Sequence, residues 1–145
     1  MRDILFRGQT HRKGEYIVNM AGDKCESHWV YGGIFPQNKD GDFTIIYQQE
    51  PEIRKFTVYA DTVGQYTGLT DKNGVRIFEG DIVTGWFNHE KIVGYIFYGG
   101  NAQFFIQRDG IYGIGLDNSD CWLEVIGNIH DNPELLGGEN NGINR

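Results

Sequence analysis

Two residues with the spacing of half a zinc site are the clearest candidates for metal chemistry in this chain. Cys25 and His28 are separated by two residues, as ligands of a structural zinc ion often are. A complete site needs a second pair with similar spacing. Cys121 stands alone, and His89 and His130 have no cysteine or second histidine close by in the sequence. We therefore predict no metal site and no cofactor.

Other patterns that support catalysis or phosphate binding are incomplete. Gly113-x-Gly115 lacks the third glycine of a dinucleotide-binding loop, and no Gly-Lys-Ser/Thr run of the P-loop type occurs. Residues 38–42 resemble the start of a calcium loop, but Phe43 stands where that loop needs glycine. No serine or cysteine lies in a motif that would pair it with a base. These patterns predict no catalytic residue, and hence a protein that is not an enzyme.

The net charge of −7 arises in the second part of the chain. Residues 1–60 contain eight basic and eight acidic residues, whereas residues 61–145 contain five and twelve. From Asp109 to Asn144 there are seven acids and no lysine or arginine. Such a surface repels phosphate backbones, which disfavours nonspecific binding to duplex nucleic acid.

The acidic stretch has two interpretations. The simpler one is a solvated face that keeps the protein soluble. The alternative is a surface that meets a basic partner or imitates nucleic acid. The candidate partner-binding residues for that alternative are Asp109, Asp117, Asp120, Glu124, Asp131 and Glu134.

The elements that would position functional side chains are predicted to be short antiparallel strands. Glycine accounts for 21 of 145 residues and is interspersed with aromatic residues, which make up 14% of the chain. Glycine allows tight turns, while aromatic and β-branched residues favour strands. We expect a mainly β fold, α+β with little helix, in which a small twisted barrel forms. The predicted strands cover residues 4–7, 15–18, 29–31, 43–47, 53–59, 65–69, 75–78, 82–87, 91–98, 103–107 and 123–129.

Turns and short helical segments are expected between and after these strands. Asn73-Gly74 is the residue pair that a type I′ turn prefers, and Asp81 is expected to bind backbone N–H groups in the turn after Glu79. Helical turns are expected near residues 116–121 and after Pro133, with Asn132 as the cap of the latter. Residues 137–145 read as a disordered tail. The residues assigned to turns are Gly68, Asp71, Asn73, Gly74, Gly80, Asp81 and Gly127.

The chain carries no expected targeting or membrane segment. Met1 to Arg7 contains only three consecutive apolar residues before an arginine, so we expect no signal peptide. No apolar run approaches the ~20 residues that span a bilayer. The two cysteines, Cys25 and Cys121, are compatible with one disulfide but are more simply interpreted as free thiols. These features predict a cytoplasmic protein without membrane contact.

Four segments in a fixed order carry a family resemblance. They are MRDILFRG at residues 1–8, VGQYTGLTDKNG at 63–74, IFEGDIV at 77–83 and EVIGNIHDNPELL at 124–136. Together they resemble the YopX family of bacteriophage and prophage proteins. The resemblance implies one domain over residues 1–136, with an N-terminal β subregion at 1–60 and an SH3-like barrel at 61–136. It implies a gene carried on mobile elements of bacteria and transfers no catalytic residue.

These observations together predict a non-enzymatic phage or prophage accessory protein in the cytoplasm of a bacterial host. It is expected to act by contact with an unidentified protein or by self-association as a homo-oligomer. In the latter case, Arg2, Arg7, Arg12 and Lys13 would meet the acidic stretch of a neighbouring copy. The alternative is a protein that binds or imitates nucleic acid and so acts on phage or host DNA or RNA machinery.

Overall fold

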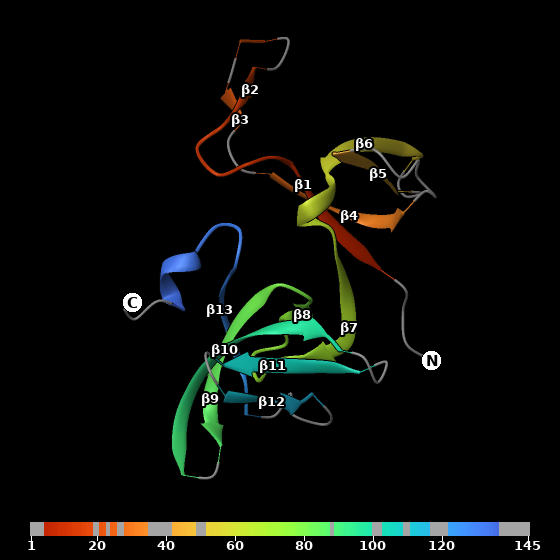
Figure 1. Cartoon of the computed structure of the whole chain (residues 1–145). Coiled ribbons are helices and arrows are strands. Elements are labelled where there is room, and N and C mark those ends of the chain that lie inside the picture. Colours follow the sequence, from red (N-terminus) through yellow and green to blue (C-terminus); the bar gives the residue numbers. More distant parts are fainter. Residues whose placement is uncertain are drawn as a thin grey trace. The chain divides into compact units, whose positions relative to one another are not determined.

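The computed structural model describes residues 5–18, 21–22, 24–25, 28–34, 42–48, 52–87, 89–99, 103–108, 111–116 and 122–136 (Figure 1). These residues form antiparallel sheets, and the only helical segments among them are two 3-10 turns, η1 (Ala60–Thr62) and η2 (Pro133–Leu135). The predicted mainly β fold with little helix is therefore confirmed. No helix in the described ranges is long and apolar enough to cross a membrane.

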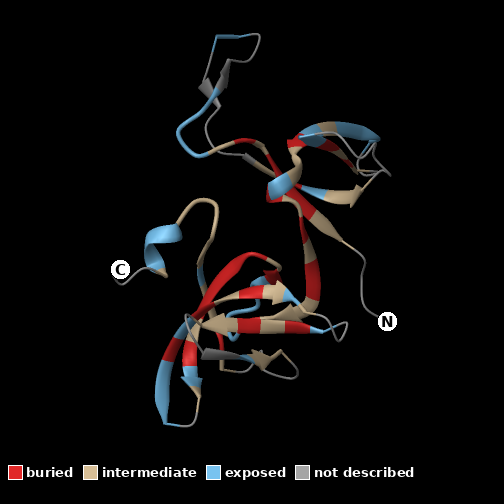
Figure 2. Cartoon of the chain, in the orientation of Figure 1, coloured by how far each residue is buried: buried red, intermediate tan, exposed pale blue. Residues whose placement is uncertain are grey.

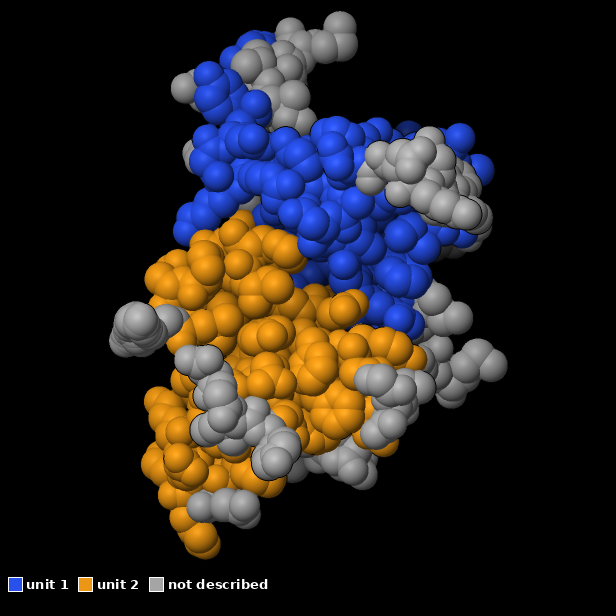
Figure 3. Space-filling model, in the orientation of Figure 1, with its two compact units in different colours: residues 1–66 blue, residues 67–145 orange. Residues whose placement is uncertain are grey.

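The chain divides into two compact units, Met1–Tyr66 and Thr67–Arg145, which Figure 3 colours blue and orange. Each unit has its own cluster of buried apolar side chains. Strand β7 (Gly64–Thr70) contributes residues to both units. The predicted tail at 137–145 lies outside the described residues.

The first unit is built on a curved antiparallel sheet. Its strands are β1 (Phe6–His11), β4 (His28–Ile34), β5 (Phe43–Gln48) and β6 (Arg54–Tyr59), and they pair in the order β6-β5-β4-β1, followed by the start of β7. A short ladder joins β2 (Ile17–Val18) to β3 (Lys24–Cys25). Val30, Ile46 and Val58 form the buried cluster, one from each of three neighbouring strands (Figure 2).

A glycine in β1 lets the sheet curve onto itself. A Cβ at Gly8 would lie 2.9 Å from Cγ2 of Val58 and 3.2 Å from Cδ1 of Ile46. Because no side chain stands at this position, β6 packs directly over β1, although the two strands are not neighbours in the sheet order. This packing brings the end of β6 close to the end of β1.

The second unit is built on a five-stranded antiparallel sheet. After the β7 hairpin with β8 (Arg76–Phe78), the strands are β9 (Asp81–Phe87), β10 (Glu90–Tyr98), β11 (Phe104–Arg108), β12 (Ile111–Gly115) and β13 (Glu124–Asn128). The order of this sheet is β12-β11-β10-β9-β13. Residues of β8 to β11, with Leu123 just before β13, form one apolar cluster, made by Ile77, Val83, Ile92, Ile96, Phe104, Ile106 and Leu123.

Several details differ from the expected elements; for example, β1 and β4 end several residues later than predicted. No closed barrel is detected among the described strands, whose order begins at β12 and ends at β13. β12 and β3 occupy segments for which no strand was predicted, because IYGIG is rich in glycine and the region around β3 is polar. The helical turn expected near residues 116–121 lies outside the described residues apart from Leu116, which is in neither helix nor strand.

Candidate functional site

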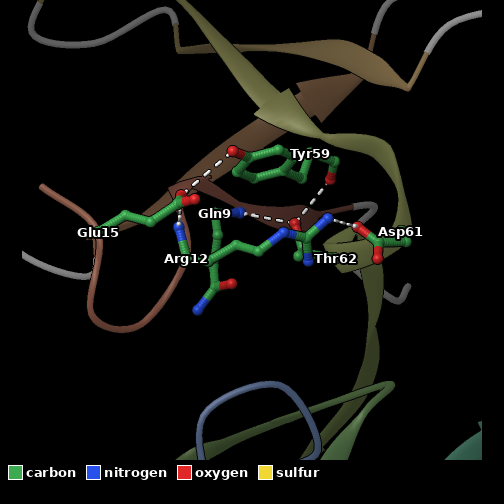
Figure 4. Close-up of polar contacts among 6 residues, drawn as sticks. All are labelled: Gln9, Arg12, Glu15, Tyr59, Asp61 and Thr62. Atoms are coloured by element: carbon green, nitrogen blue, oxygen red, sulfur yellow. Dashed lines mark hydrogen bonds and ion pairs between the residues drawn. The ribbon is translucent and has the colours of Figure 1, made fainter. Parts of the chain in front are cut away.

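A cluster of polar and aromatic side chains joins the ends of β1 and β6 in the first unit (Figure 4). We call Arg12, Glu15, Tyr59 and Asp61 the Arg12 cluster. The guanidinium of Arg12 lies over the ring of Tyr59, with its Cζ 4.0 Å from the ring centroid. Its Nη2 is 3.1 Å from Oδ1 of Asp61. Arg12 thus makes a cation–π contact and an ion pair at once.

The carboxylate of Glu15 holds the other side of this arrangement. Its Oε1 accepts the backbone N–H of Arg12 at 2.8 Å and the hydroxyl of Tyr59 at 3.1 Å. The turn from Arg12 to Glu15 makes this possible, since the N–H of Glu15 donates to the carbonyl of Arg12 at 2.9 Å. Gly14 occupies the left-handed region in that turn, with φ of 89°. The ring of Tyr59 is therefore fixed at its hydroxyl and over one face.

The charges in the cluster stabilise one another. Asp61, which hydrogen-bonds and attracts the guanidinium, raises the pKa of Arg12. The backbone N–H of Arg12 lowers the pKa of Glu15, and the hydroxyl of Tyr59 and the charge of Arg12 lower it further. Arg12 and Glu15 are therefore both charged at neutral pH.

Buried hydrogen bonds hold the backbone beneath the cluster. Oγ1 of Thr62 accepts the N–H of Gln9 at 2.9 Å and donates to the carbonyl of Tyr59 at 2.7 Å. Gln9 and Thr62 are each 1% exposed. These bonds tie η1 to β1 and so fix the position of Asp61.

A cavity of about 460 Å³ opens beside the Arg12 cluster. Its described lining consists of Arg12, Asp42, Phe43, Tyr59, Ala60 and Asp61. Phe43 and Tyr59 are partners in the β5–β6 register, and their ring centroids are 5.0 Å apart. The described lining combines two rings, one cation and two carboxylates, a set that can make cation–π contacts and charge-assisted hydrogen bonds.

The sequence did not single out this site as a whole. In the sequence Arg12 stands out only as one of four basic residues, Phe43 and Tyr59 lie in predicted strands, and no local pattern marks Asp61. Arg12 and Asp61 are 49 residues apart in the chain. Only the packing of β6 over β1 brings them together, and no local pattern records it.

Among the residues the structure describes, no group of three histidine, cysteine, aspartate or glutamate side chains is placed to hold a metal ion. The side chains of Cys25 and His28, and the whole of Cys121, lie outside the described part. The backbone register places His28 opposite His11 of β1. The predicted absence of zinc stays a prediction.

The acidic residues predicted to bind a partner are only partly described. Asp109, Asp117 and Asp120 lie outside the described residues. Oε1 of Glu124 is 3.8 Å from Nζ of Lys72, and Oδ2 of Asp131 accepts Nδ2 of Asn128 at 3.3 Å. Glu134 is exposed in η2.

The basic stretch proposed for self-association does not form one exposed surface. Arg7 is only 7% exposed, and its Cζ lies 4.5 Å from the ring centroid of Trp29. Arg12 belongs to the Arg12 cluster, Lys13 is exposed, and Arg2 lies outside the described residues. The prediction that Arg7 offers its charge to a neighbouring copy is therefore wrong, because β1 turns that side chain inward.

A comparison with protein families shows to which family the chain belongs. Residues 21–137 match the family model described as YopX protein. The chain belongs to the YopX family. The resemblance carried by the sequence motifs is thereby confirmed.

A solved structure supports the fold of this YopX-family chain. The chain is similar to the crystal structure of protein EF1440 from Enterococcus faecalis, with 24% sequence identity and a TM-score of 0.50. The match covers 94% of this chain and 100% of that chain. No curated protein matches the sequence. The likeness concerns the fold alone.

The central YopX motif builds a turn around one buried carboxylate. Asp71 is 4% exposed, and its Oδ1 accepts the N–H groups of Asn73 and Val75 at 2.8 and 2.9 Å. Its Oδ2 accepts the N–H of Val125 in β13 at 2.9 Å. Burial raises the pKa of Asp71, but these three donors more than offset it, and the net pKa lies below its usual range.

The backbone of this turn differs from the predicted type. Gly74 has φ of 83°, and its N–H donates to the carbonyl of Asp71 at 3.0 Å. Asn73 is not in the positive-φ region. A type I′ turn needs positive φ at both central residues, so that prediction is wrong. The Asp71 carboxylate allows a longer loop by binding its N–H groups.

The remaining turn residues of the motifs have different tasks. Gly68 and Gly80 have φ of 91° and 93°. Asp81 is buried, and its Oδ2 accepts the N–H of Phe78 at 2.7 Å across the Glu79-Gly80 turn. Gly127 has no positive φ.

The last YopX motif forms a turn closed by two asparagines. Oδ1 of Asn128 accepts the N–H groups of His130 and Asp131 at 3.0 and 2.9 Å. Oδ1 of Asn132 accepts the N–H of Asn128 at 3.2 Å. The side chain of Asn132 does not cap η2, contrary to the prediction, because it bonds back to the end of β13. A Cβ at Gly127 would lie 2.6 Å from that Oδ1, so the turn requires glycine there.

Proposed function

We propose that this YopX-family protein is a non-enzymatic phage or prophage accessory protein that acts by protein–protein contact in the cytoplasm of a bacterial host. The observation that carries the proposal is the cavity beside the Arg12 cluster. Its described lining contains tyrosine, phenylalanine and arginine but no serine, cysteine or histidine. Tyrosine and arginine are the residue types that most often dominate binding energy at protein interfaces.

The state of the lining side chains also supports binding. Arg12, Tyr59 and Asp61 are held by contacts within the chain, so little side-chain freedom is lost when a partner arrives. A preformed surface of this kind favours rigid recognition. We also propose that residues 61–136 have an SH3-like barrel topology. The antiparallel order β12-β11-β10-β9-β13 supports this topology, which would serve as a scaffold for contacts.

The test is capture of a partner by the full chain. The wild-type protein is immobilised and exposed to lysate of prophage-bearing host cells, beside a variant in which Phe43 and Asp61 are replaced, Phe43→Ser with Asp61→Arg. We expect a protein retained by the wild type and lost with the variant. Retention of the same proteins by both would contradict a role for this site. An exposed acid at the start of β10, changed by Glu90→Gln, serves as the matched control.

Self-association is tested separately. Light scattering of the purified chain at several salt concentrations reports its mass. A homo-oligomer held by charge dissociates as salt rises, because screening weakens contacts between exposed charges. A monomer at every ionic strength removes self-association and leaves a different protein as the partner.

A second candidate function is direct contact with single-stranded nucleic acid, favoured by one specific observation. Trp86 of β9 is 67% exposed and pairs in register with Lys91 of β10. Val93, also exposed, lies on the same face of the sheet, two residues further along β10. An exposed indole beside a lysine can stack a base and contact a phosphate.

Fluorescence titration with a short oligothymidylate at low salt tests this candidate. Direct binding predicts quenching that the Trp86→Phe variant loses and that Lys91→Gln weakens. Absence of quenching at low salt removes direct contact with nucleic acid.

A further inference from the structure

The charged residues that line the cavity beside the Arg12 cluster favour one sign of charge on a ligand. The described lining contains one cation, Arg12, and two carboxylates, Asp42 and Asp61. Glu15 adds a third carboxylate next to the hydroxyl of Tyr59. Among these described residues the one cation is already paired with Asp61, so they offer an anionic ligand no unpaired positive charge, whereas they offer a cationic ligand an excess of negative charge.

The chain itself shows how this site holds a cation. Arg12 lies over one ring of the pair and against one carboxylate, at 4.0 Å and 3.1 Å. The other ring of the pair, Phe43, is 48% exposed and is adjacent in sequence to Asp42. Because Asp42 and Phe43 both line the cavity, its described lining offers a second ring and a second carboxylate, and the chain's own arginine lies over the ring of Tyr59.

Backbone and ring contacts also hold Asp42 and Phe43 in place. The N–H of Ala60 donates to the carbonyl of Asp42 at 2.8 Å, which ties the start of β5 to the end of β6. The ring of Phe43 packs at 5.0 Å and 32° against Tyr59. The exposed part of Phe43 is therefore held in place for a cation–π contact.

The volume indicates more than a single small ion. About 460 Å³ lies within the range of roughly 300–1,000 Å³ that ligand sites usually have. A long basic side chain together with the residues that flank it would fill this space. A bare metal ion would not, and it would also prefer carboxylates to rings.

From these observations we propose that the cavity binds an arginine or lysine side chain of a protein partner, with the cation over Phe43 and against Asp42. This inference rests on the proposed function of protein contact, because it names the chemistry of the partner segment.

The experiment uses the full chain and short blocked peptides as probes. The peptide acetyl-Gly-Arg-Gly-amide is titrated against the isotope-labelled protein, and amide shifts near Phe43 and Tyr59 are followed by NMR. We expect saturable shifts with a dissociation constant on the order of 1 mM, as befits one side chain. The peptide with citrulline in place of arginine has nearly the same shape without the charge, and it should cause no saturable shift.

Two variants locate the contact. Asp42→Asn removes one exposed charge and should weaken binding about two- to fivefold. Phe43→Leu removes the ring and should weaken binding by about the same factor. Glu90→Gln, at an exposed acid of β10 that does not line the cavity, is the matched control and should leave the affinity unchanged. Spectra without peptide show whether each variant is folded, and the Glu90 variant sets the scale of indirect effects.

Several results would overturn the inference. They are equal binding of the arginine and citrulline peptides, stronger binding of a glutamate peptide, unchanged affinity in both Asp42→Asn and Phe43→Leu, and no saturable shift with any peptide. The proposed function fails differently, since it falls if the wild type captures no partner. A partner captured equally by wild type and Phe43→Leu would leave protein contact standing and remove the cation site.

Discussion

The carboxylate of Asp71 accepts backbone N–H groups that would otherwise need carbonyl partners. It does so where β7 ends and where β8 and β13 begin. Two of its acceptor bonds close the hairpin loop, and the third reaches Val125. Neighbouring backbone groups reinforce the junction, since the N–H of Lys72 donates to the carbonyl of Leu123 at 2.9 Å. One ionised side chain therefore connects the central motif to the last one.

Removing the charge of Asp71 should destabilise the second unit. In Asp71→Asn one oxygen can still accept from the loop, but the amide NH₂ would face the N–H of Val125, donor against donor. We expect a loss of about 2–3 kcal/mol in the free energy of unfolding, the range for a buried donor left without its charged acceptor. Urea unfolding followed by circular dichroism measures it. Asp42→Asn, an exposed aspartate in the other unit, should change the value by less than about 0.5 kcal/mol.

The lowered pKa of Asp71 also predicts a pH dependence. The folded pKa lies below the unfolded one, so the stabilising contribution is complete above the unfolded pKa of about 3.9 and is lost as pH falls through the folded value. The stability difference between wild type and Asp71→Asn should be constant from about pH 7 to 5 and shrink below about pH 4. Unfolding curves of both proteins across this range decide it. A difference that shrinks near neutral pH would mean that Asp71 is not the group responsible.

At the residue scale, the sequence predicts the contacts that Asp71 makes within its own turn, but not those it makes with distant residues. Asp71 to Gly74 is recognisable as a turn because these residue types bind their own backbone or accept positive φ. The bond to Val125 spans 54 residues, and nothing in the local pattern indicates it. The same limit applies to Arg12, whose turn with Glu15 is local but whose partners Tyr59 and Asp61 are distant.

At the scale of elements, the turn after β13 depends on a close approach rather than on an unusual backbone angle. A methyl group at Gly127 would press on the side chain of Asn132, which closes the turn. We expect Gly127→Ala to cost about 1–3 kcal/mol, as overpacking does. Thermal and urea unfolding measure the change.

The chain offers a matched control for that substitution. A Cβ at Gly115 of β12 meets no atom within 4 Å, and this glycine has no positive φ. Gly115→Ala should therefore leave stability within about 0.5 kcal/mol of wild type. Equal effects of the two substitutions would show that the contact with Asn132 does not constrain Gly127.

The strands themselves were predictable where apolar and polar residues alternate over enough length. β5, β6, β9, β10 and β11 lie within a residue or two of their predicted bounds, since each carries aromatic and β-branched residues between clear turn signals. β12 was missed because two of its five residues are glycine. β12 is a strand because it pairs with the neighbouring strand β11. The composition of the segment itself does not indicate this pairing.

At the scale of the whole chain, the two units differ in their buried apolar clusters. Among the described residues, seven buried apolar side chains form the cluster of the second unit, and three form that of the first. Because local stability follows buried apolar contacts, amides in β9 to β11 should exchange with solvent at least about tenfold more slowly than those in β4 to β6. Hydrogen exchange followed by mass spectrometry tests this. Faster exchange in β9 to β11 would contradict it.

The bond between Asp71 and Val125 has a consequence for how the protein is made. A ribosome delivers Asp71 well before the N–H that its second oxygen requires, because 54 residues separate the two. During that interval the hairpin carries a carboxylate that must remain hydrated. The second unit therefore completes its fold only after β13 has emerged, whereas the strands paired in the first unit are all delivered by residue 66. We therefore expect the first unit, with the cavity beside the Arg12 cluster, to be able to fold before the remainder of the chain has emerged.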